Sequence, residues 1–464
     1  MLRIYNTLTR NKEQFVPLND GVVKMYACGI TVNGKAHIGH AVQAVIFDII
    51  RKYLEKSGYK VTYARNFTDV DDKIIAQANA CNMDAMEFAK MNMEAITKSL
   101  HELGVTDATL TLNATDNIDN IIEFVSKLID KGVAYATVDG DVYFAVDKYL
   151  EYGKLSNRNL EDAISGVRID TMENKRNPLD FALWKAAKPG EIYWESPWGS
   201  GRPGWHIECS AMNLYHLGEQ IDIHGGGRDL IFPHHENEIA QTEALTGKQF
   251  AKYWIHNGLV KVNGQKMSKS LGNGIMLDDL LAKYDSEVVR FGLIQGNYKN
   301  DLNITDNLFD EVENHLYDFY VALDKVNKLG VKSDNVNPKI DEEFNVAMDD
   351  DFNTALAIAN LFGYFKTINK KLEAKDNSCV EDRNAIVKTY SLFGILQHNP
   401  AEFIEKINQK RNGNIPEIVK QKAEERWVAK QNRDFATADR LRGELTELGY
   451  TIKDSKDGYE IQKM

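Results

Sequence analysis

The sequence predicts an α/β protein organised around a parallel sheet, and three stretches indicate this class. The apolar run 22–27 has the composition of a buried strand and passes through a glycine-containing turn into a strongly periodic helix. The run 60–66 has the same composition and precedes another helix, and IDIHGGG at 221–227 is a strand that ends in glycines. Backbone N–H groups and positive helix ends collect at the carboxyl edge of such a sheet, so we expect a phosphate-binding crevice there.

The turn after the first predicted strand has the sequence CGITVNGKAHIGH, residues 28–40. It begins with the thiol of Cys28 and ends with two imidazoles, His37 and His40, on either side of Gly39. Both rings can face the crevice, and a flat ligand ring could lie against the backbone of Gly39. The same residues also suit a core cysteine and two helix-capping histidines, so both interpretations stay open when this stretch is considered alone.

A second basic motif occurs in KVNGQKMSKSLGN, where Lys266 and Lys269 lie three residues apart between two glycines. The glycines suggest a mobile loop. Two lysines beside small hydroxyl side chains suit a triphosphate, because their charges can approach as negative charge builds on the leaving group. A lysine pair on a loop is more often only a solvated surface, and that alternative also stays open.

The two motifs together are more specific than either alone. HIGH near the N-terminus followed by KMSKS resembles the class I aminoacyl-tRNA synthetases, whose nucleotide-binding domain carries these signatures in this order. The resemblance implies that His37, His40, Lys266 and Lys269 bind ATP and act catalytically on its phosphates and leaving group. It also implies that Gly39 contacts the adenine.

Composition limits the class of protein. With 43% hydrophobic and 27% charged residues over 464 positions, the chain is expected to be globular and to form several domains. No apolar run approaches the length of a membrane span, and the start has no apolar signal core, so we expect a cytoplasmic protein. The four cysteines are scattered, which fits a reducing compartment. The net charge of −12 argues against a global field for nucleic acid, although residues 401–464 carry a local charge of +1.

A candidate metal set comes from residues that lie far apart in the chain. Cys28 follows one strand, Cys209 is expected at the start of a helix, and His234 and Glu238 are four residues apart on one helix face. His235 is expected to point elsewhere. Thiolates, an imidazole and a carboxylate are suitable ligands for Zn²⁺. The spacing alone is weak, and separate structural roles for these residues remain an alternative.

Five blocks make the resemblance narrower: CGITVNGKAHIGHA, RNFTDVDDKI, GWHIECSAM, DIHGGGRDLIFPHHENEIAQ and KMSKSLGN. Together they resemble the cysteinyl-tRNA synthetases. The resemblance implies ATP-dependent activation of L-cysteine and transfer of the cysteinyl group to tRNA(Cys), the activity of a cysteine–tRNA ligase. It implies one Zn²⁺ per chain on Cys28, Cys209, His234 and Glu238, and Mg²⁺ bound with ATP. Thr68, Trp205, His224 and Asp229 are the candidate substrate-binding residues around that pocket.

The chemistry explains why a cysteine enzyme would use zinc. Cysteine and serine differ by one atom, and a pocket that reads only shape discriminates such pairs by about 1–3 kcal/mol. A metal that favours the deprotonated sulfur gains little from a neutral hydroxyl, so it adds selectivity without an editing domain. The predicted insertion at 116–197 is too small for a convincing editing domain.

The sequence and the resemblance predict the following domains. A Rossmann-type parallel-sheet catalytic domain covers 1–115 and 198–300, and an inserted connective domain with a hairpin at Asp139-Gly140 covers 116–197. An α-helical bundle follows at 301–398, where the sequence reads as helical and amphipathic. A small mixed α/β domain at 399–464 is expected to contain one helix, 422–449, and then a pair of strands. The resemblance makes this small domain the anticodon-binding end.

Basic and aromatic side chains mix on that C-terminal helix, and we take Arg426, Trp427, Arg433 and Arg440 as candidate tRNA contacts. Solvated arginines and one packing tryptophan are the alternative. We expect a monomer, because no coiled coil or long apolar stripe is visible.

Three rival functions each fit only part of the sequence. A ligase that joins activated cysteine to a sugar amine lacks the final small domain, and the 165 residues after 299 argue against it. An inactive paralogue that binds RNA would not need intact HIGH and KMSKS motifs. A generic nucleotidyltransferase would share HIGH but would not explain the zinc set.

Overall fold

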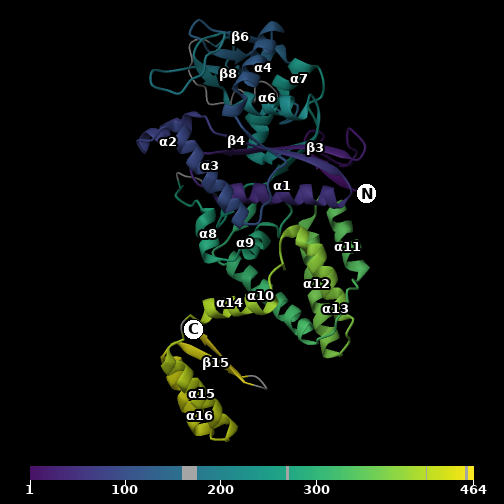
Figure 1. Cartoon of the computed structure of the whole chain (residues 1–464), viewed down its shortest axis with the longest axis vertical. Coiled ribbons are helices and arrows are strands. Elements are labelled where there is room, and N and C mark those ends of the chain that lie inside the picture. The colour runs from purple at the N-terminus through teal and green to yellow at the C-terminus, as the bar shows by residue number, and fades with distance from the viewer. Residues whose placement is uncertain (159–174, 268–270, 414, 455–457, 464) are drawn as a thin grey trace. The chain divides into compact units, whose positions relative to one another are not determined.

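The computed structural model describes residues 1–158, 175–267, 271–413, 415–454 and 458–463 (Figure 1). These residues form two compact units, each of which is described by itself. The first unit comprises Met1–Val312, Asn337–Tyr364 and Ala385–Ile395. The second comprises Glu313–Val336, Phe365–Asn384 and Leu396–Met464.

The core of the first unit is a parallel sheet with the strand order β11-β10-β3-β4-β5. Its strands are β3 Val22–Thr31, β4 Lys60–Thr68, β5 Leu110–Asn113, β10 Ile221–Gly227 and β11 Ala251–Asn257. β3, the first of these strands in the sequence, therefore lies between β4, which follows it in the chain, and β10, which comes after the predicted insertion. Ligands of such sheets bind where the strand order reverses, at the carboxyl ends. The predicted α/β fold class is confirmed.

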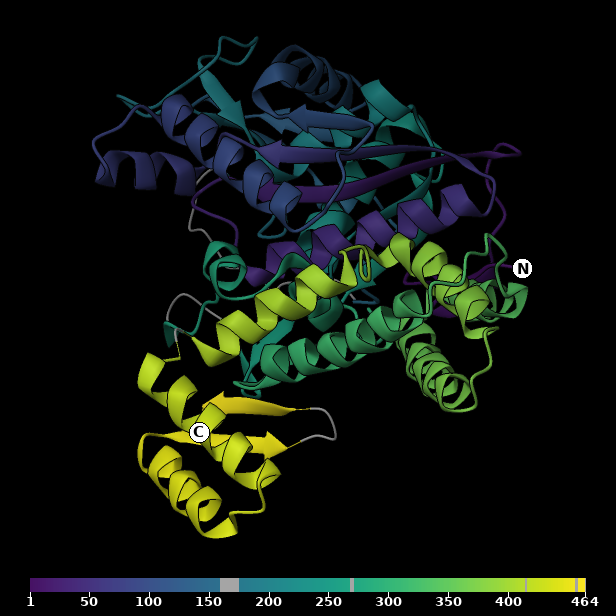
Figure 2. The ribbon, with the colours of Figure 1, turned by 60° about the horizontal axis from the view of Figure 1, so that its bottom comes forward.

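Helices cover both faces of this sheet (Figure 1). α1 Ile38–Lys56 packs along β4 on one face, and α6 Trp205–Leu217 contacts β3 and β4 on the other. Figure 2 shows α1, the long purple helix, from a second direction beside the strands. Because successive residues of a strand point to opposite faces, each residue of β4 faces either the α1 side or the α6 side.

The first unit contains further elements around the sheet. Its other helices are α2 Asp72–Ala80, α3 Ala85–Glu102, α4 Ile118–Asp130, α7 Glu236–Thr246, α8 Leu277–Lys283, α9 Ser286–Leu293 and α11 Pro338–Asp349. Its other strands are β1 Arg3–Asn6, β2 Asn11–Gln14, β12 Val260–Val262, β13 Gln265–Lys266 and β14 Leu302–Ile304. β14 pairs with β12, so residues 302–304 form a strand where the sequence predicted only helix.

An antiparallel sheet forms from the segment that was predicted as an insertion, 116–197, together with one strand, β9 Gly201–Pro203, that lies just after it. Its other strands are β6 Ala134–Ala136, β7 Val142–Phe144 and β8 Phe181–Ala186. β6 and β7 form the predicted hairpin, and Gly140 at its turn has φ +92°, a left-handed conformation that glycine adopts readily.

The remaining helices include three that have residues in both units and three in the second unit alone. The former are α10 Leu308–Lys328, α12 Thr354–Glu373 and α13 Cys379–Tyr390. The latter are α14 Pro400–Asn412, α15 Glu417–Gln431 and α16 Phe435–Glu447. No helix in the described part of the chain is long and apolar enough to cross a bilayer.

The last stretch differs from the prediction in one respect. The single helix expected at 422–449 is divided into α15 and α16, because Arg433 turns to φ 60° and the Asp434 side chain accepts a hydrogen bond from Thr437 N at the start of the second helix. The pair of strands after it is confirmed as β15 Tyr450–Asp454 and β16 Tyr459–Lys463.

Candidate functional site

Two thiols meet at the carboxyl end of the sheet. Cys28 lies on β3, which continues past its predicted end to Thr31 after a register shift between Ala27 and Ile30. Cys209 lies one turn inside α6, and not at its start as predicted. The Sγ atoms are 3.6 Å apart, and both cysteines are buried free thiols.

His234 and Glu238 complete a cluster with the two cysteines. A short turn, Ile231–His235, precedes α7, so His234 lies just before the helix that carries Glu238. The Nε2 atom of His234 is 3.0 Å from Glu238 Oε1, and Cys28 Sγ is 3.2 Å from the same oxygen. One ligand atom from each of the four residues lies within 4.8 Å of the others. The structure brings together the four residues that the sequence analysis selected.

The spacing of these atoms fits a tetrahedral ion. Zinc binds sulfur at about 2.3 Å and nitrogen or oxygen at about 2.0–2.2 Å, which places two sulfurs of a tetrahedron roughly 3.7 Å apart. The two Sγ atoms are separated by 3.6 Å. Two thiolates, one imidazole and one carboxylate also form a donor set that zinc takes in proteins. The residues present therefore fit Zn²⁺.

Neighbouring side chains hold two of these candidate ligands in place. His224, buried on β10, lies with Nε2 2.8 Å from Glu238 Oε2, which leaves Oε1 directed at the cluster. The Nδ1 atoms of His206 and His234 are 2.9 Å apart, and the Trp205 ring stacks on His234 with the centroids 4.3 Å apart. Such partners fix the orientation and tautomer of metal ligands.

His235 was predicted to point elsewhere, and this is wrong. Its Nε2 atom lies 3.9 Å from Glu238 Oε1, and its Nδ1 atom lies 2.8 Å from Nε2 of His256. Cys28, His224 and His235 could together also hold an ion. The turn before α7 causes the difference, because its residues do not follow the regular helical spacing on which the prediction was based.

The electrostatics of the cluster favour a cation. Burial raises the pKa of Glu238, but His224 and His234 outweigh burial and hold that pKa well below its usual value. The hydrogen bond from Cys28 lowers the pKa of Cys209 to about 6 against the effect of burial, while burial raises the pKa of Cys28. Burial lowers the pKa of His234, but Glu238 and Cys209 outweigh it and raise the pKa to about 10. A bound metal ion would take over the role of the His234 proton as counter-charge.

The substrate-binding candidates differ in position. Thr68 is buried and donates a hydrogen bond to Glu208 Oε2 at 3.0 Å. Trp205 is 38% exposed above His234, so one face of the cluster adjoins an accessible indole. Asp229 is exposed on the turn after β10, and the described contacts do not connect it to the cluster.

Sequence reasoning missed several residues next to the cluster. Asn66 accepts a hydrogen bond from Gly29 N at 2.8 Å, and its Oδ1 atom lies 3.8 Å from Cys209 Sγ. Glu208 is buried beside the site, and burial raises its pKa well above the usual value. His206 and Glu208 precede Cys209 in GWHIECSAM, so their place in that block was the available signal.

The HIGH motif forms the start of α1. His37 is the N-cap residue, and its side chain accepts a hydrogen bond from Gly39 N at 3.1 Å. The rings of His37 and His40 stack with their centroids 3.6 Å apart. A helix N-terminus with exposed N–H groups favours phosphate. Capping and phosphate binding are thus compatible roles for these histidines.

The segment around KMSKS returns to this helix start. A methyl group on Gly39 would lie 3.6 Å from Cε of Met267. The backbone after the motif pairs with the HIGH segment, because Ile38 N donates to Ile275 O at 2.9 Å. Lys266 is exposed on β13, and Lys269 lies outside the described residues. The described residues on both sides of 268–270 therefore lie beside the HIGH segment in the first unit.

The predicted tRNA contacts are divided between buried and exposed positions. Arg426 is buried, and its Nη1 and Nη2 atoms each donate to Asp454 at 2.8 Å. The Trp427 ring lies 5.8 Å from that of Tyr459. Arg433 and Arg440 are exposed. The charge of Arg426 is thus already engaged within the second unit.

Comparison with known proteins places this geometry in a family. Residues 14–314 match the family described as the class I (C) tRNA synthetase catalytic domain, and residues 343–397 match the DALR domain. A cysteine–tRNA ligase of Syntrophotalea carbinolica is 45% identical over 98% of both chains. One of Geobacter sulfurreducens is 45% identical, again over 98% of each. The chain belongs to the cysteine–tRNA ligase family.

A solved structure supports the fold independently. A methionyl-tRNA synthetase of Mycobacterium tuberculosis, described with bound methionyl-adenylate, matches with a TM-score of 0.58 at 16% identity. The match covers 86% of this chain and 93% of that one. At this identity the likeness concerns the fold, which is that of class I aminoacyl-tRNA synthetases. The recognition of the family from HIGH, KMSKS and the cysteine-specific blocks is confirmed, and so is the assignment of the chain as an enzyme.

Proposed function

We propose that this cysteine–tRNA ligase uses Zn²⁺ on Cys28, Cys209, His234 and Glu238 to select the thiol of L-cysteine. The observation that supports this most strongly is the buried four-ligand cluster on the strand that leads into HIGH. Bound zinc would supply a soft Lewis acid that prefers a thiolate to a neutral hydroxyl. His206 and His224 would orient the ligands, and Trp205 would cover the amino acid beside them.

The chain's own residues would position the first reaction. The carboxylate oxygen of cysteine attacks the α-phosphorus of ATP, the new C–O–P bond forms, and the bond to pyrophosphate breaks. Positioning and charge stabilisation dominate such phosphoryl chemistry. His37 and His40 would stabilise the phosphates at the helix start, and Lys266 and Lys269 would neutralise the leaving pyrophosphate. Mg²⁺ would accompany ATP, held mostly by phosphates and water.

The second reaction would transfer the cysteinyl group to tRNA(Cys). A hydroxyl of the terminal ribose, the 2′-hydroxyl by class resemblance, attacks the cysteinyl carbonyl and AMP leaves. Arg433 and Arg440 in the second unit are the better candidates for tRNA contact, because they are exposed whereas Arg426 is buried against Asp454. Thr68 would act near the amino acid through Glu208. His224 would act on the substrate only through Glu238, and we keep Asp229 as a candidate at the rim.

The proposal also includes the domains, the oligomeric state and the compartment of the protein. We keep the predicted domains at 1–115 with 198–300, 116–197, 301–398 and 399–464, and a monomer as the active form. A reducing cytoplasmic setting suits the site, because Cys28 and Cys209 must remain free thiols to bind a metal.

The test compares a ligand variant with a matched control. Cys209→Ser removes one zinc ligand, and Cys81→Ser changes an exposed cysteine outside the cluster. Cysteine- and serine-dependent ATP–pyrophosphate exchange would be measured beside the metal content of each protein. We expect Cys209→Ser to lose zinc and to approach the discrimination of a shape-based pocket, about 10- to 200-fold. Cys81→Ser should match the parent in both measurements.

A second measurement protects against a folding defect. The parent protein would be stripped of metal by a chelator and reloaded with Zn²⁺, and both forms would be checked by circular dichroism. Discrimination should fall with the metal and return with it. A zinc-free protein that still rejects serine as well as the parent does would refute the proposal.

A further inference from the structure

A cavity lies on the face of the parallel sheet opposite the metal cluster. It is enclosed by β4, α1, α3 and the segment between α3 and β5, all within the first unit. Its volume is about 70 Å³. One water molecule needs roughly 10–15 Å³ in the same measure, so this cavity has room for a small molecule.

Arg65 projects into this cavity from the middle of the sheet. It shares a face of β4 with Tyr63 and Phe67, which also line the cavity, whereas Asn66 and Thr68 point to the catalytic side. Arg65 is only 9% exposed, and its Nη2 atom is buried without a hydrogen-bond partner in the part of the chain that the structure describes. Buried guanidinium groups are normally paired, because the desolvation of an isolated charge is costly.

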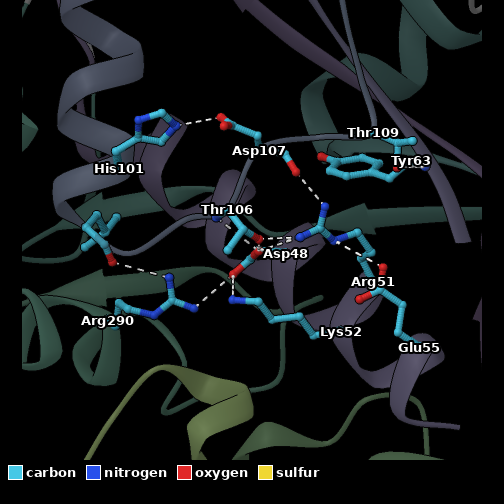
Figure 3. Close-up of polar contacts among 11 residues, drawn as sticks. Asp48, Arg51, Lys52, Glu55, Tyr63, His101, Thr106, Asp107, Thr109 and Arg290 are labelled. Atoms are coloured by element: carbon cyan, nitrogen blue, oxygen red, sulfur yellow. Dashed lines mark hydrogen bonds and ion pairs between the residues drawn. The ribbon is translucent and has the colours of Figure 1, made fainter. Parts of the chain in front are cut away.

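Asp48, which accepts a hydrogen bond from Thr106 of the cavity lining, already pairs with other cations. Figure 3 shows Asp48 surrounded by Lys52, Arg290 and Arg51. Its Oδ2 atom lies 2.8 Å from Lys52 Nζ and 3.1 Å from Arg290 Nη2, and its Oδ1 atom lies 3.7 Å from Arg51 Nη2. Asp48 thus has its counter-charges without Arg65.

Two polar side chains at the mouth of the cavity also contact each other. His101 and Asp107 both line it, and Nε2 of the histidine is 2.6 Å from Oδ1 of the aspartate (Figure 3). Their side chains are 49% and 75% exposed, so this pair lies at the solvent edge. Asp107 therefore lies at the entrance, and none of the described contacts joins it to the guanidinium of Arg65.

We propose that this cavity binds the carboxylate of a small organic acid, with the Arg65 guanidinium as its counter-charge. The planar fork of a guanidinium matches a carboxylate in two parallel hydrogen bonds. A carboxylate carries the single negative charge that balances one arginine, whereas a doubly charged phosphate would face Asp107 with one charge unmatched. The site is separate from the amino acid pocket, because the sheet lies between them.

The rest of the lining favours an acid with a hydrocarbon part. Ala44, Phe67, Leu100, Val105 and Ala108 give the cavity apolar walls beside the arginine. Apolar walls with a few convergent polar groups are typical of small-molecule sites. A short aliphatic carboxylate would bury its chain against these walls and place its charge on Arg65.

The test is a ligand-observed NMR titration of the full-length, zinc-loaded chain with butyrate. We expect saturable binding with a Kd on the order of 1 mM, since the ligand is small. The neutral isostere n-butanol should bind at least about tenfold more weakly, because charge-assisted hydrogen bonds are lost. Arg65→Met should weaken butyrate binding by about 10- to 100-fold for the same reason.

Two further variants separate charge from folding. Lys60→Met removes an exposed cation at the start of the same strand and should leave butyrate binding unchanged. Ala108→Leu fills the cavity while keeping Arg65, so it should abolish binding even if Arg65→Met fails to fold. The proposal is overturned if the parent shows no saturable binding, or if Ala108→Leu or a folded Arg65→Met binds butyrate as the parent does. Inorganic phosphate that binds more tightly than butyrate would overturn the choice of a carboxylate.

Discussion

Replacing His224 with phenylalanine should weaken zinc binding although no ligand is removed. The phenyl ring keeps the shape that stacks on Trp254, where the centroids are 4.4 Å apart, but it cannot donate to Glu238 Oε2, now 2.8 Å away. Loss of an outer hydrogen-bond partner typically costs 10–100-fold in metal affinity, which is about 1.4–2.7 kcal/mol. The cost of leaving a buried carboxylate oxygen unsatisfied, about 1–3 kcal/mol, gives the same range independently.

The assay is competition for Zn²⁺ between the protein and a chromogenic chelator, which reports affinity without reference to aminoacylation. His216→Phe is the matched control, because His216 is an exposed histidine on α6 that pairs with Asn117 and lies outside the cluster. His224→Phe should release zinc to the chelator at a lower chelator concentration than the parent and the control. If its zinc affinity equals that of the parent, His224 does not orient Glu238 and this account of the site is wrong.

Three further predictions concern the nucleotide site, the core and the metal. Gly39→Val should lower ATP–pyrophosphate exchange by about 10- to 100-fold. Its Cβ alone would lie 3.0 Å from the His37 ring, and its methyl groups would fill the face where the nucleotide would bind. An unchanged KM for ATP would contradict this. Asp48→Ala should reduce the free energy of unfolding by about 3–5 kcal/mol in urea denaturation, because it leaves Arg290 buried and unpaired. Burial raises the pKa of Asp48, but Lys52 and Arg290 outweigh it and lower that pKa. The stability that Asp48 contributes is therefore present above its unfolded pKa of ~4 and lost as the pH falls through the lower folded value, so variant and parent should converge in acid. Removing zinc should lower the Tm measured by calorimetry. With free zinc at 100 times its Kd, bound zinc stabilises the folded state by about 2.7 kcal/mol, and this is lost on removal. An unchanged Tm would argue against a metal bound only by the folded state.

The sequence predicted the residues that bring chemistry to the site better than the residues that support them. Cys28, Cys209, His234 and Glu238 could be selected because their residue types are unusual together and lie in blocks that resemble one family. His206 was not selected, because its role depends on a ring-to-ring contact with His234 that no spacing rule describes, and its place in GWHIECSAM was its only signal.

In the second unit the predictions missed the partner of Arg426 and the break between two helices. Arg426 was taken as an RNA contact because basic and aromatic side chains mix on its helix. Its actual partner, Asp454, lies on a strand 28 residues later, and the helical pattern does not indicate that contact. The break between α15 and α16 at Arg433 involves neither glycine nor proline, but Asn432 ends the first helix and Asp434 caps the second, so the prediction missed a local signal. Propensity and periodicity describe local structure, whereas the pairing of Arg426 depends on tertiary packing.

The metal cluster and the nucleotide motif depend on one local distortion of β3. The register shift between Ala27 and Ile30 lies where Cys28 meets the cluster, and the strand then continues toward His37 at the start of α1. Gly29 makes this possible, because a Cβ at that position would lie 1.5 Å from the carbonyl oxygen of Asn66. Any side chain at residue 29 would force β3 away from β4 and displace Cys28 from Cys209. The order Cys-Gly before the HIGH segment is thus a steric requirement, and it couples the place where the thiol would be recognised to the place where ATP would be held.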